Sequence, residues 1–430
     1  MMLRPAAALC ALLAAILPAQ AQSLAGALLD GTPNADLRLR YESVTDKARA
    51  LPADAITFRV RLGYETAPWH GLTLAAAADI LVPVGDTAYN TTRNGKTVYP
   101  TIGDPQLVAL KHLNLAWSGF DTRIVAGRQR LALGSQRFLA SPDWRMHGQS
   151  FDAVQLVNSA LDGLELTYIW IGRVNRLYGD TLPFDPAAAA AATNQAGYYK
   201  SDSHVLGAAY TGIAGLKLEA YALLLDLDPP GYATRPAQLA AAARLSTATY
   251  GARAEYDLPL SDDLRARFIA DYARQQPYAA NPLSFGLDYW LGEAGLSWRG
   301  FGLGLGYEVL SGNGTVALST PIGMLHANNG WADLFTTTPL NGLADLYARG
   351  SYAWPGFLGL RGLTATVTYH DFKTGRLGRG IGSEWDAQTE LQLDAHVTLL
   401  AKYANYAGSG AAFGGFPDKS VFWLQTVFRY

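Results

Sequence analysis

Hydrophobic and polar residues alternate one by one along most of this 430-residue chain. In one stretch near the N-terminus, Ile56, Phe58 and Val60 occupy alternate positions around Thr57 and Arg59. Since successive side chains of a β-strand point to opposite faces, this period of two predicts strands with one apolar and one polar face. Read this way, the chain after residue 21 divides into about eighteen segments of roughly ten residues.

The connections between these segments alternate in length. Short ones, such as 118–121 and 159–163, interleave with long ones, such as 82–106, 134–149 and 312–344. Short turns on one rim and long loops on the other are typical of outer-membrane β-barrels. The pattern therefore predicts an all-β fold: a closed antiparallel transmembrane β-barrel of about eighteen strands, with short periplasmic turns and long extracellular loops.

The last segment carries the alternation to the end of the chain. Phe422 and Leu424 share one face with the terminal Tyr430, whereas Arg429 lies on the other face. We expect this segment to close the barrel by pairing with the first strand, 37–41. Tyr430 would then face lipid at the periplasmic interface, where the barrel-assembly machinery recognises it, and Arg429 would point into the pore mouth.

The first 21 residues have the features of a secretory signal peptide. Arg4 precedes an apolar run that ends in Pro18-Ala19-Gln20-Ala21, a small-x-small cleavage site. The run is too short to span a bilayer. Residues 1–21 are therefore predicted to be removed, leaving residues 22–430 as one barrel domain in the outer membrane of a Gram-negative bacterium. The only cysteine, Cys10, would be lost with the signal peptide.

Composition supports a barrel over a soluble protein. Hydrophobic residues make up 49% and charged residues 16% of the chain, against about 25% charged residues in soluble domains. The net charge of −2 excludes a generally basic nucleic-acid-binding protein. Most tryptophans are expected in the interfacial girdles, although one or two could stack on sugar rings inside the pore. These tryptophans are Trp69, Trp117, Trp170, Trp298, Trp354, Trp385 and Trp423.

Charged residues on the strands should face the lumen, because an arginine facing lipid at the midplane costs roughly 2–4 kcal/mol. The arginines expected there are Arg38, Arg40, Arg59, Arg61, Arg128, Arg130, Arg253, Arg265, Arg267 and Arg349. They could form an electropositive constriction that binds carboxylates. Alternatively, they could brace the wall by pairing with acidic residues on the same faces. These are Glu42, Glu65, Asp79, Glu255, Asp271, Glu293, Glu308, Glu384, Asp386 and Glu390.

Motifs for catalysis are absent from the sequence. It has no Gly-x-Ser-x-Gly elbow and no His-Glu-x-x-His motif, and its seven histidines are scattered without the spacing of metal ligands. We therefore expect no enzyme activity, no metal and no cofactor.

Four short stretches in the first half of the chain form a recognisable set: Gly127-Arg128-Gln129, Gln136-Arg137-Phe138, Trp144-Arg145 and Phe151-Asp152-Ala153-Val154. Together they resemble the alginate export family of outer-membrane porins. The resemblance extends from about residue 37 to the end of the chain. It implies an eighteen-stranded barrel whose arginine-lined pore passes an anionic polysaccharide outward, with loops that gate it. By the same implication, Arg128, Arg130, Arg137 and Arg145 belong to the pore wall or its gate.

These observations predict a monomeric outer-membrane channel for the passive, selective passage of polar, anionic solutes or uronate polysaccharide. Its expected partners are outer-membrane lipid, the barrel-assembly machinery and, for a polysaccharide cargo, periplasmic proteins that deliver it; nucleic acid is not expected. Two alternatives stay open. One is a barrel enzyme of the lipase or deacylase type, and the other is a non-conducting structural or adhesion barrel.

Overall fold

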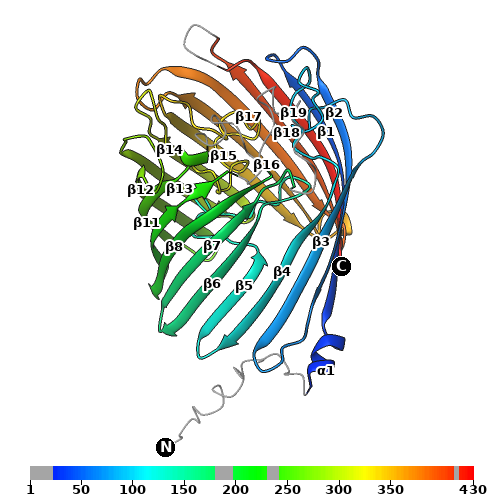
Figure 1. Cartoon of the computed structure of the whole chain (residues 1–430). Helices are drawn as coiled ribbons and strands as arrows, with labels where there is room; N and C mark the ends of the chain where they lie inside the picture. Colours follow the sequence, from blue (N-terminus) through cyan, green and yellow to red (C-terminus); the bar gives the residue numbers. More distant parts are fainter. Residues whose placement is uncertain (1–22, 180–196, 230–241, 411–415) are drawn as a thin grey trace, which may run out of the picture.

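The computed structural model describes residues 23–179, 197–229, 242–410 and 416–430, so the predicted signal peptide lies outside the described residues. The described chain forms a closed antiparallel barrel of eighteen strands (Figure 1), which confirms the predicted fold class. The labels reach β19 because β10 continues β9 beyond a break at Asp226.

The strands are β1 (Thr32–Asp46), β2 (Ala53–Glu65), β3 (Leu72–Pro83), β4 (Leu107–Gly119), β5 (Thr122–Gln129), β6 (Ser150–Leu161), β7 (Leu164–Asn175), β8 (Tyr198–Ile213), β9 (Leu216–Leu225), β10 (Leu227–Asp228), β11 (Thr247–Pro259), β12 (Leu264–Pro277), β13 (Leu287–Trp298), β14 (Phe301–Leu310), β15 (Leu343–Pro355), β16 (Gly362–Lys373), β17 (Gly380–Gln392), β18 (Val397–Gly408) and β19 (Lys419–Arg429). A 3₁₀ turn, η1 (Phe357–Gly359), joins β15 to β16.

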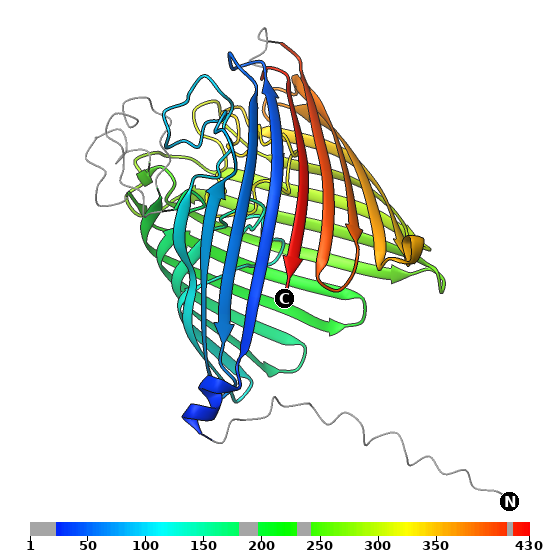
Figure 2. The ribbon, with the colours of Figure 1, turned by 90° about the vertical axis from the view of Figure 1, so that its right-hand side faces the viewer.

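A short helix, α1 (Leu24–Leu29), precedes the barrel. The side chain of Ser23 caps it by accepting a hydrogen bond from the Gly26 amide at 3.0 Å. Figure 2 shows α1 at the rim that carries the short turns, which we assign to the periplasm, with the long connections at the opposite rim. No helix among the described residues is both long enough and apolar enough to cross a membrane.

The last strand closes the barrel against the first, as predicted. β1 and β19 pair antiparallel, with Leu37 opposite Phe428 and Tyr41 opposite Leu424. They run side by side in Figures 1 and 2. The Tyr430 amide extends this ladder by donating to the carbonyl of Ala35 at 2.9 Å. Closure leaves no free edge strand, as a barrel in lipid requires.

The two faces of the wall differ as the alternation predicts. Outward-facing side chains are large and apolar; Leu303, for example, is 66% exposed. Inward-facing side chains include charged ones that are fully buried, such as Arg59 and Asp79. An apolar outer band around a polar interior is the arrangement that a bilayer stabilises.

Replacing Leu305, an outward-facing residue in the middle of β14, by arginine should therefore destabilise the barrel by about 2–4 kcal/mol, the cost of an arginine on the lipid face near the midplane. Urea unfolding in lipid vesicles would measure the change. Arginine at Ser351, an inward-facing position of the neighbouring strand β15, is the matched control and should cost much less. Equal losses at the two positions would contradict the assignment of faces.

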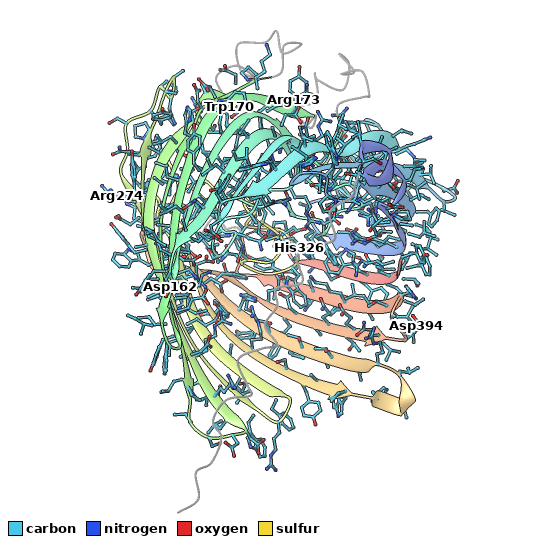
Figure 3. All side chains as sticks on the ribbon, turned by 90° about the horizontal axis from the view of Figure 1, so that it is seen from below. Asp162, Trp170, Arg173, Arg274, His326 and Asp394 are labelled. Atoms are coloured by element: carbon cyan, nitrogen blue, oxygen red, sulfur yellow. The ribbon has the colours of Figure 1, made fainter. Side chains whose placement is uncertain are left out.

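Two long connections fold inward rather than outward. We call residues 130–149, between β5 and β6, loop A, and residues 311–342, between β14 and β15, loop B. Both contribute to a buried apolar cluster with the inner wall; Leu139 and Phe138 come from loop A, and Leu318 and Ile322 from loop B. Seen from below in Figure 3, His326 of loop B lies near the middle of the opening. These loops therefore narrow the lumen.

Candidate functional site: the lumen constriction

One side of the constriction is a basic wall on β1, β2 and β4. Arg38, Arg40, Arg59 and Lys111 are buried there. All four donate to main-chain carbonyl oxygens of loop A. Arg38 donates to Asp143 at 2.8 Å, Arg40 to Trp144 at 2.6 Å, Arg59 to Met146 at 2.9 Å, and Lys111 to Gly148. Three predicted arginines and Lys111, which was not predicted, thus hold loop A in place through its backbone.

Asp143 of loop A gathers the charges of this wall. Arg61 of β2 binds both of its carboxylate oxygens, at 2.9 and 3.0 Å. Arg59, Arg38 and Lys111 lie at 3.6, 3.9 and 3.9 Å. Burial raises the pKa of Asp143, but Arg61 and Lys111 outweigh that effect and hold the pKa well below its ordinary value. Asp143 is therefore the ionised centre of the basic wall.

Arg145, two residues further along loop A, is a cation surrounded by carboxylates, the reverse of Asp143. Its guanidinium binds the carboxylate of Glu42 on β1 at 2.8 and 2.9 Å. It also lies 3.4 Å from Asp333 of loop B and 3.8 Å from Asp104, in the connection between β3 and β4. One cation therefore ties together three carboxylates from separate parts of the chain.

The other side of the constriction is an acidic wall on β14, β15 and β17, and it holds loop B. The amides of Trp331 and Ala332 donate to Asp386 and Glu384 at 3.1 and 2.7 Å. The preceding residue, Gly330, has a φ of 83°, and a Cβ there would lie 2.5 Å from a carboxylate oxygen of Glu384. Only glycine allows this approach of loop B to the wall.

Glu308 on β14 and Asp345 on β15 add to this wall. The side-chain amide of Asn329 in loop B donates to both carboxylates. His370 on β16 bonds Asp345 at 2.9 Å and lies 3.6 Å from Asp386. The acidic wall therefore binds loop B through amide donors, as the basic wall binds loop A through carbonyl acceptors.

Loops A and B meet in the lumen. The amide of Ala140 donates to the carbonyl of Ile322 at 3.0 Å, and the amide of Met324 donates to the carbonyl of Gln136 at 2.9 Å. Arg137 of loop A donates to Asn329 at 2.7 Å and pairs with Glu308 at 3.1 Å. The two loops therefore form one unit that joins the oppositely charged walls.

The remaining predicted arginines lie away from this junction. Arg253 on β11 is paired with Glu255 at 2.7 Å and with Asp271 at 3.3 Å, and Arg267 also binds Glu255. Arg130, at the start of loop A, is exposed and makes a long contact with the carbonyl of Ser141. Arg265 and Arg349 are exposed, and no ion pair joins either to another described residue. Arg429 binds Asp36 at 3.2 Å.

The expectation that Arg128 lines the lumen is wrong. Arg128 lies opposite Leu113 of β4 and Asp152 of β6, and Leu113 is 47% exposed on the outer surface. The inward positions of β5 are taken by residues such as Gln129 instead. The guanidinium makes a two-pronged ion pair with Asp152, at 2.6 and 2.9 Å, which offsets part of the cost of facing outward.

Trp423 also departs from the expected girdle position. It is 1% exposed, on the inward face of β19, and its ring meets the ring of Trp144 edge-on at 5.5 Å. Lys402 on β18, to which the sequence assigned no role, lies beside both rings. Its place on the inward face of a strand was the only available signal, since the partner rings come from distant parts of the chain.

A polar recess of about 620 Å³ lies on the periplasmic side of loop A, against the inner faces of β6 to β9. Gln155, Glu165, Thr167 and Glu219 contribute polar groups to it. In the described part of the chain, no group of three or more His, Cys, Asp or Glu side chains could hold a metal ion.

Solved structures with the same architecture exist for other outer-membrane proteins. OccAB2 of Acinetobacter baumannii matches with a TM-score of 0.69 at 13% identity, over 94% of this chain and 99% of that one. OccK3 of Pseudomonas aeruginosa matches with a TM-score of 0.67 at 15% identity, over 95% and 98%. The outer membrane protein OpdK of P. aeruginosa matches with a TM-score of 0.65 at 15% identity, over 94% and 100%.

The chain has the fold of an outer-membrane porin. At these identities the similarity establishes the fold alone. No family model matches the sequence, and no curated protein does. The porin fold agrees with one part of the resemblance noted in the sequence, but alginate export itself has no support from these comparisons.

Proposed function

We propose that this chain is a passive outer-membrane channel selective for small solutes that carry a carboxylate. The observation that carries the proposal is the basic wall, where buried guanidinium groups already bind oxygen atoms of loop A. One N–H group on each of Arg38, Arg40 and Arg59 has no hydrogen-bond partner among the described residues and is buried, so a solute would reach these groups by displacing part of loop A. Guanidinium donors of this kind suit the planar, two-oxygen geometry of a carboxylate.

The packing of the loops favours a small solute over a polysaccharide. Loops A and B join across the lumen through main-chain hydrogen bonds and share an apolar cluster with the wall. A uronate chain threading the barrel would have to separate them. One structure of OpdK contains vanillate, a small aromatic carboxylate. We propose the same chemical class for this channel.

Channel recordings in planar bilayers would test this function. A salt gradient should give a reversal potential that favours anions, and vanillate should reduce the chloride current more than its neutral methyl ester does. If the acid and the ester reduced the current equally, the channel would not recognise the carboxylate. Block by oligouronates stronger than block by vanillate would return the polysaccharide alternative, and a channel that never conducts would favour the structural or adhesion barrel.

A further inference from the structure

The junction of the two loops is centred on a relay of three ionisable side chains. Nδ1 of His326 in loop B lies 2.8 Å from a carboxylate oxygen of Asp333, and Nε2 lies 2.7 Å from Nζ of Lys402 on β18. A lysine ammonium can only donate, so Nε2 must accept. The proton of the neutral ring therefore sits on Nδ1 and is donated to Asp333.

Aromatic rings from both loops enclose this relay. The ring of Trp144 in loop A stacks on the His326 ring, with centroids 4.3 Å apart and planes 3° apart. Nζ of Lys402 lies 3.7 Å from the Trp331 ring centroid and 4.2 Å from that of Trp144. The ring of Trp423 is the third neighbour, at 5.6 Å. A cation over ring faces is stabilised by their quadrupoles, so Lys402 attracts both loops.

Every element packed around His326 contributes a charge. Asp333 and Lys402 contact the ring, and Arg145 of loop A lies near it. Around Lys402 lie Glu384 and Asp386 of β17 and Arg40 of β1. Lys419 of β19 donates to the carbonyl of Ala332 and lies near Asp333. A second proton on His326 would place an N–H cation against the Lys402 ammonium at hydrogen-bond distance, and the two would repel.

We propose that the Asp333–His326–Lys402 relay is an acid-sensitive latch: it holds loop A against loop B while His326 is neutral, and it releases them when His326 is protonated. Release frees the Trp144 ring, separates the Ala140–Ile322 contact and widens the lumen. The latch rests on the proposed function only in supposing that the lumen conducts.

The direction of the pH effect follows from linkage. Burial, together with the cations Lys402 and Arg145, lowers the pKa of His326 from 6.5 to about 3, although Asp333 opposes the change. In released loops the pKa would return toward 6.5. Between these values the released state binds the extra proton, so the ratio of released to latched channels should rise up to about tenfold per unit fall in pH. The latch is fully stable above about pH 6.5.

Bilayer recordings between pH 7 and pH 4.5 on wild type and H326Q would test the latch. Glutamine keeps an oxygen acceptor for Lys402 but cannot titrate. Wild type should spend more time in a wider conductance state as the pH falls, and H326Q should not. The matched control is H70Q, which replaces an exposed histidine in a periplasmic turn and should behave as wild type. An acid response of H326Q equal to that of wild type would overturn the proposal.

A disulfide lock tests whether the loops separate. The pair A140C with I322C joins the positions that share a main-chain hydrogen bond, and the chain has only one other cysteine, Cys10. The oxidised channel should lose the acid response and regain it on reduction. An acid response that persists in the oxidised channel would also overturn the latch.

The labelling of A140C alone distinguishes failure of the latch from failure of the pore. Ala140 is fully buried, so dithiodipyridine, which reacts with thiols in acid, should label this cysteine slowly at pH 7 and faster at pH 4.5. The increase should vanish when H326Q is added. Faster labelling in a barrel that never conducts would support the latch and refute the channel; no increase in a conducting barrel would refute the latch alone.

Discussion

Replacing Asp143 by asparagine should make the channel markedly more anion-selective and should destabilise it. The carboxylate of Asp143 neutralises Arg61 directly, with Arg59, Arg38 and Lys111 within 4 Å. Asparagine keeps the shape but removes the counterion that these cations share, whereas Asp79 still pairs with Arg61 and Asp36 with Arg59. Removing one partner of a buried ion pair costs about 3–5 kcal/mol when the other charge is left without compensation. Because Asp143 is 20% exposed, we expect the lower part of that range.

Reversal potentials in a salt gradient would measure the change in selectivity, and urea unfolding in lipid vesicles would measure the loss of stability. D86N changes an exposed aspartate in an extracellular loop and should alter neither quantity. If D143N kept the wild-type reversal potential, the basic wall would not control the ions that pass.

Replacing Arg145 by glutamine should act in the opposite direction. Arg145 is the cation shared by Glu42, Asp333 and Asp104. Without it, three carboxylates face one another at the junction of the loops, and two of them, Glu42 and Asp104, are buried. We expect selectivity to shift toward cations and stability to fall by about 3–5 kcal/mol, since one partner of a buried network is lost. Repulsion between Glu42 and Asp333 should also loosen loop B.

The matched control for R145Q is R299Q, which removes an exposed arginine from a periplasmic turn. Its reversal potential and unfolding curve should match those of wild type. Asp143 and Arg145 are two residues apart, so opposite shifts from D143N and R145Q would separate charge effects from general damage to loop A. Shifts of the same sign would refute the opposite charge surroundings assigned to Asp143 and Arg145.

Alternation was sufficient to predict the wall of the barrel. Each strand from β1 to β19 must put one face toward lipid and one toward the lumen, and the residue types record that choice at every second position. The pairing of the last strand with the first followed because a barrel must close on its own ends, and the structure sets its register, with Leu37 opposite Phe428. The exception, Arg128, lies on a short strand where alternation alone left the faces ambiguous, and pairing with Leu113 and Asp152 decided between them.

The sequence predicted most of the charged residues that face the lumen, but not which atoms they bind there. The sequence left open whether its arginines form a free basic constriction or brace the wall. In the described structure, Arg59 and Arg61 brace the wall by pairing with Asp36 and Asp79 on the neighbouring strands. Arg38, Arg40 and Arg59 also hold the backbone of loop A, which neither alternative included. Main-chain carbonyls leave no mark on the sequence, and a long polar loop reads the same whether it folds outward or inward.

The barrel, its closure and the inward face of most charged residues are therefore predictable from the sequence, because they depend on local periodicity and on the lipid and water that the wall separates. The tertiary structure alone decided that loops A and B enter the lumen and join there, and that Trp144, His326 and Lys402 meet. Those contacts connect residues 76 to 258 positions apart, and they depend on how loops pack inside the closed wall, which no local pattern encodes.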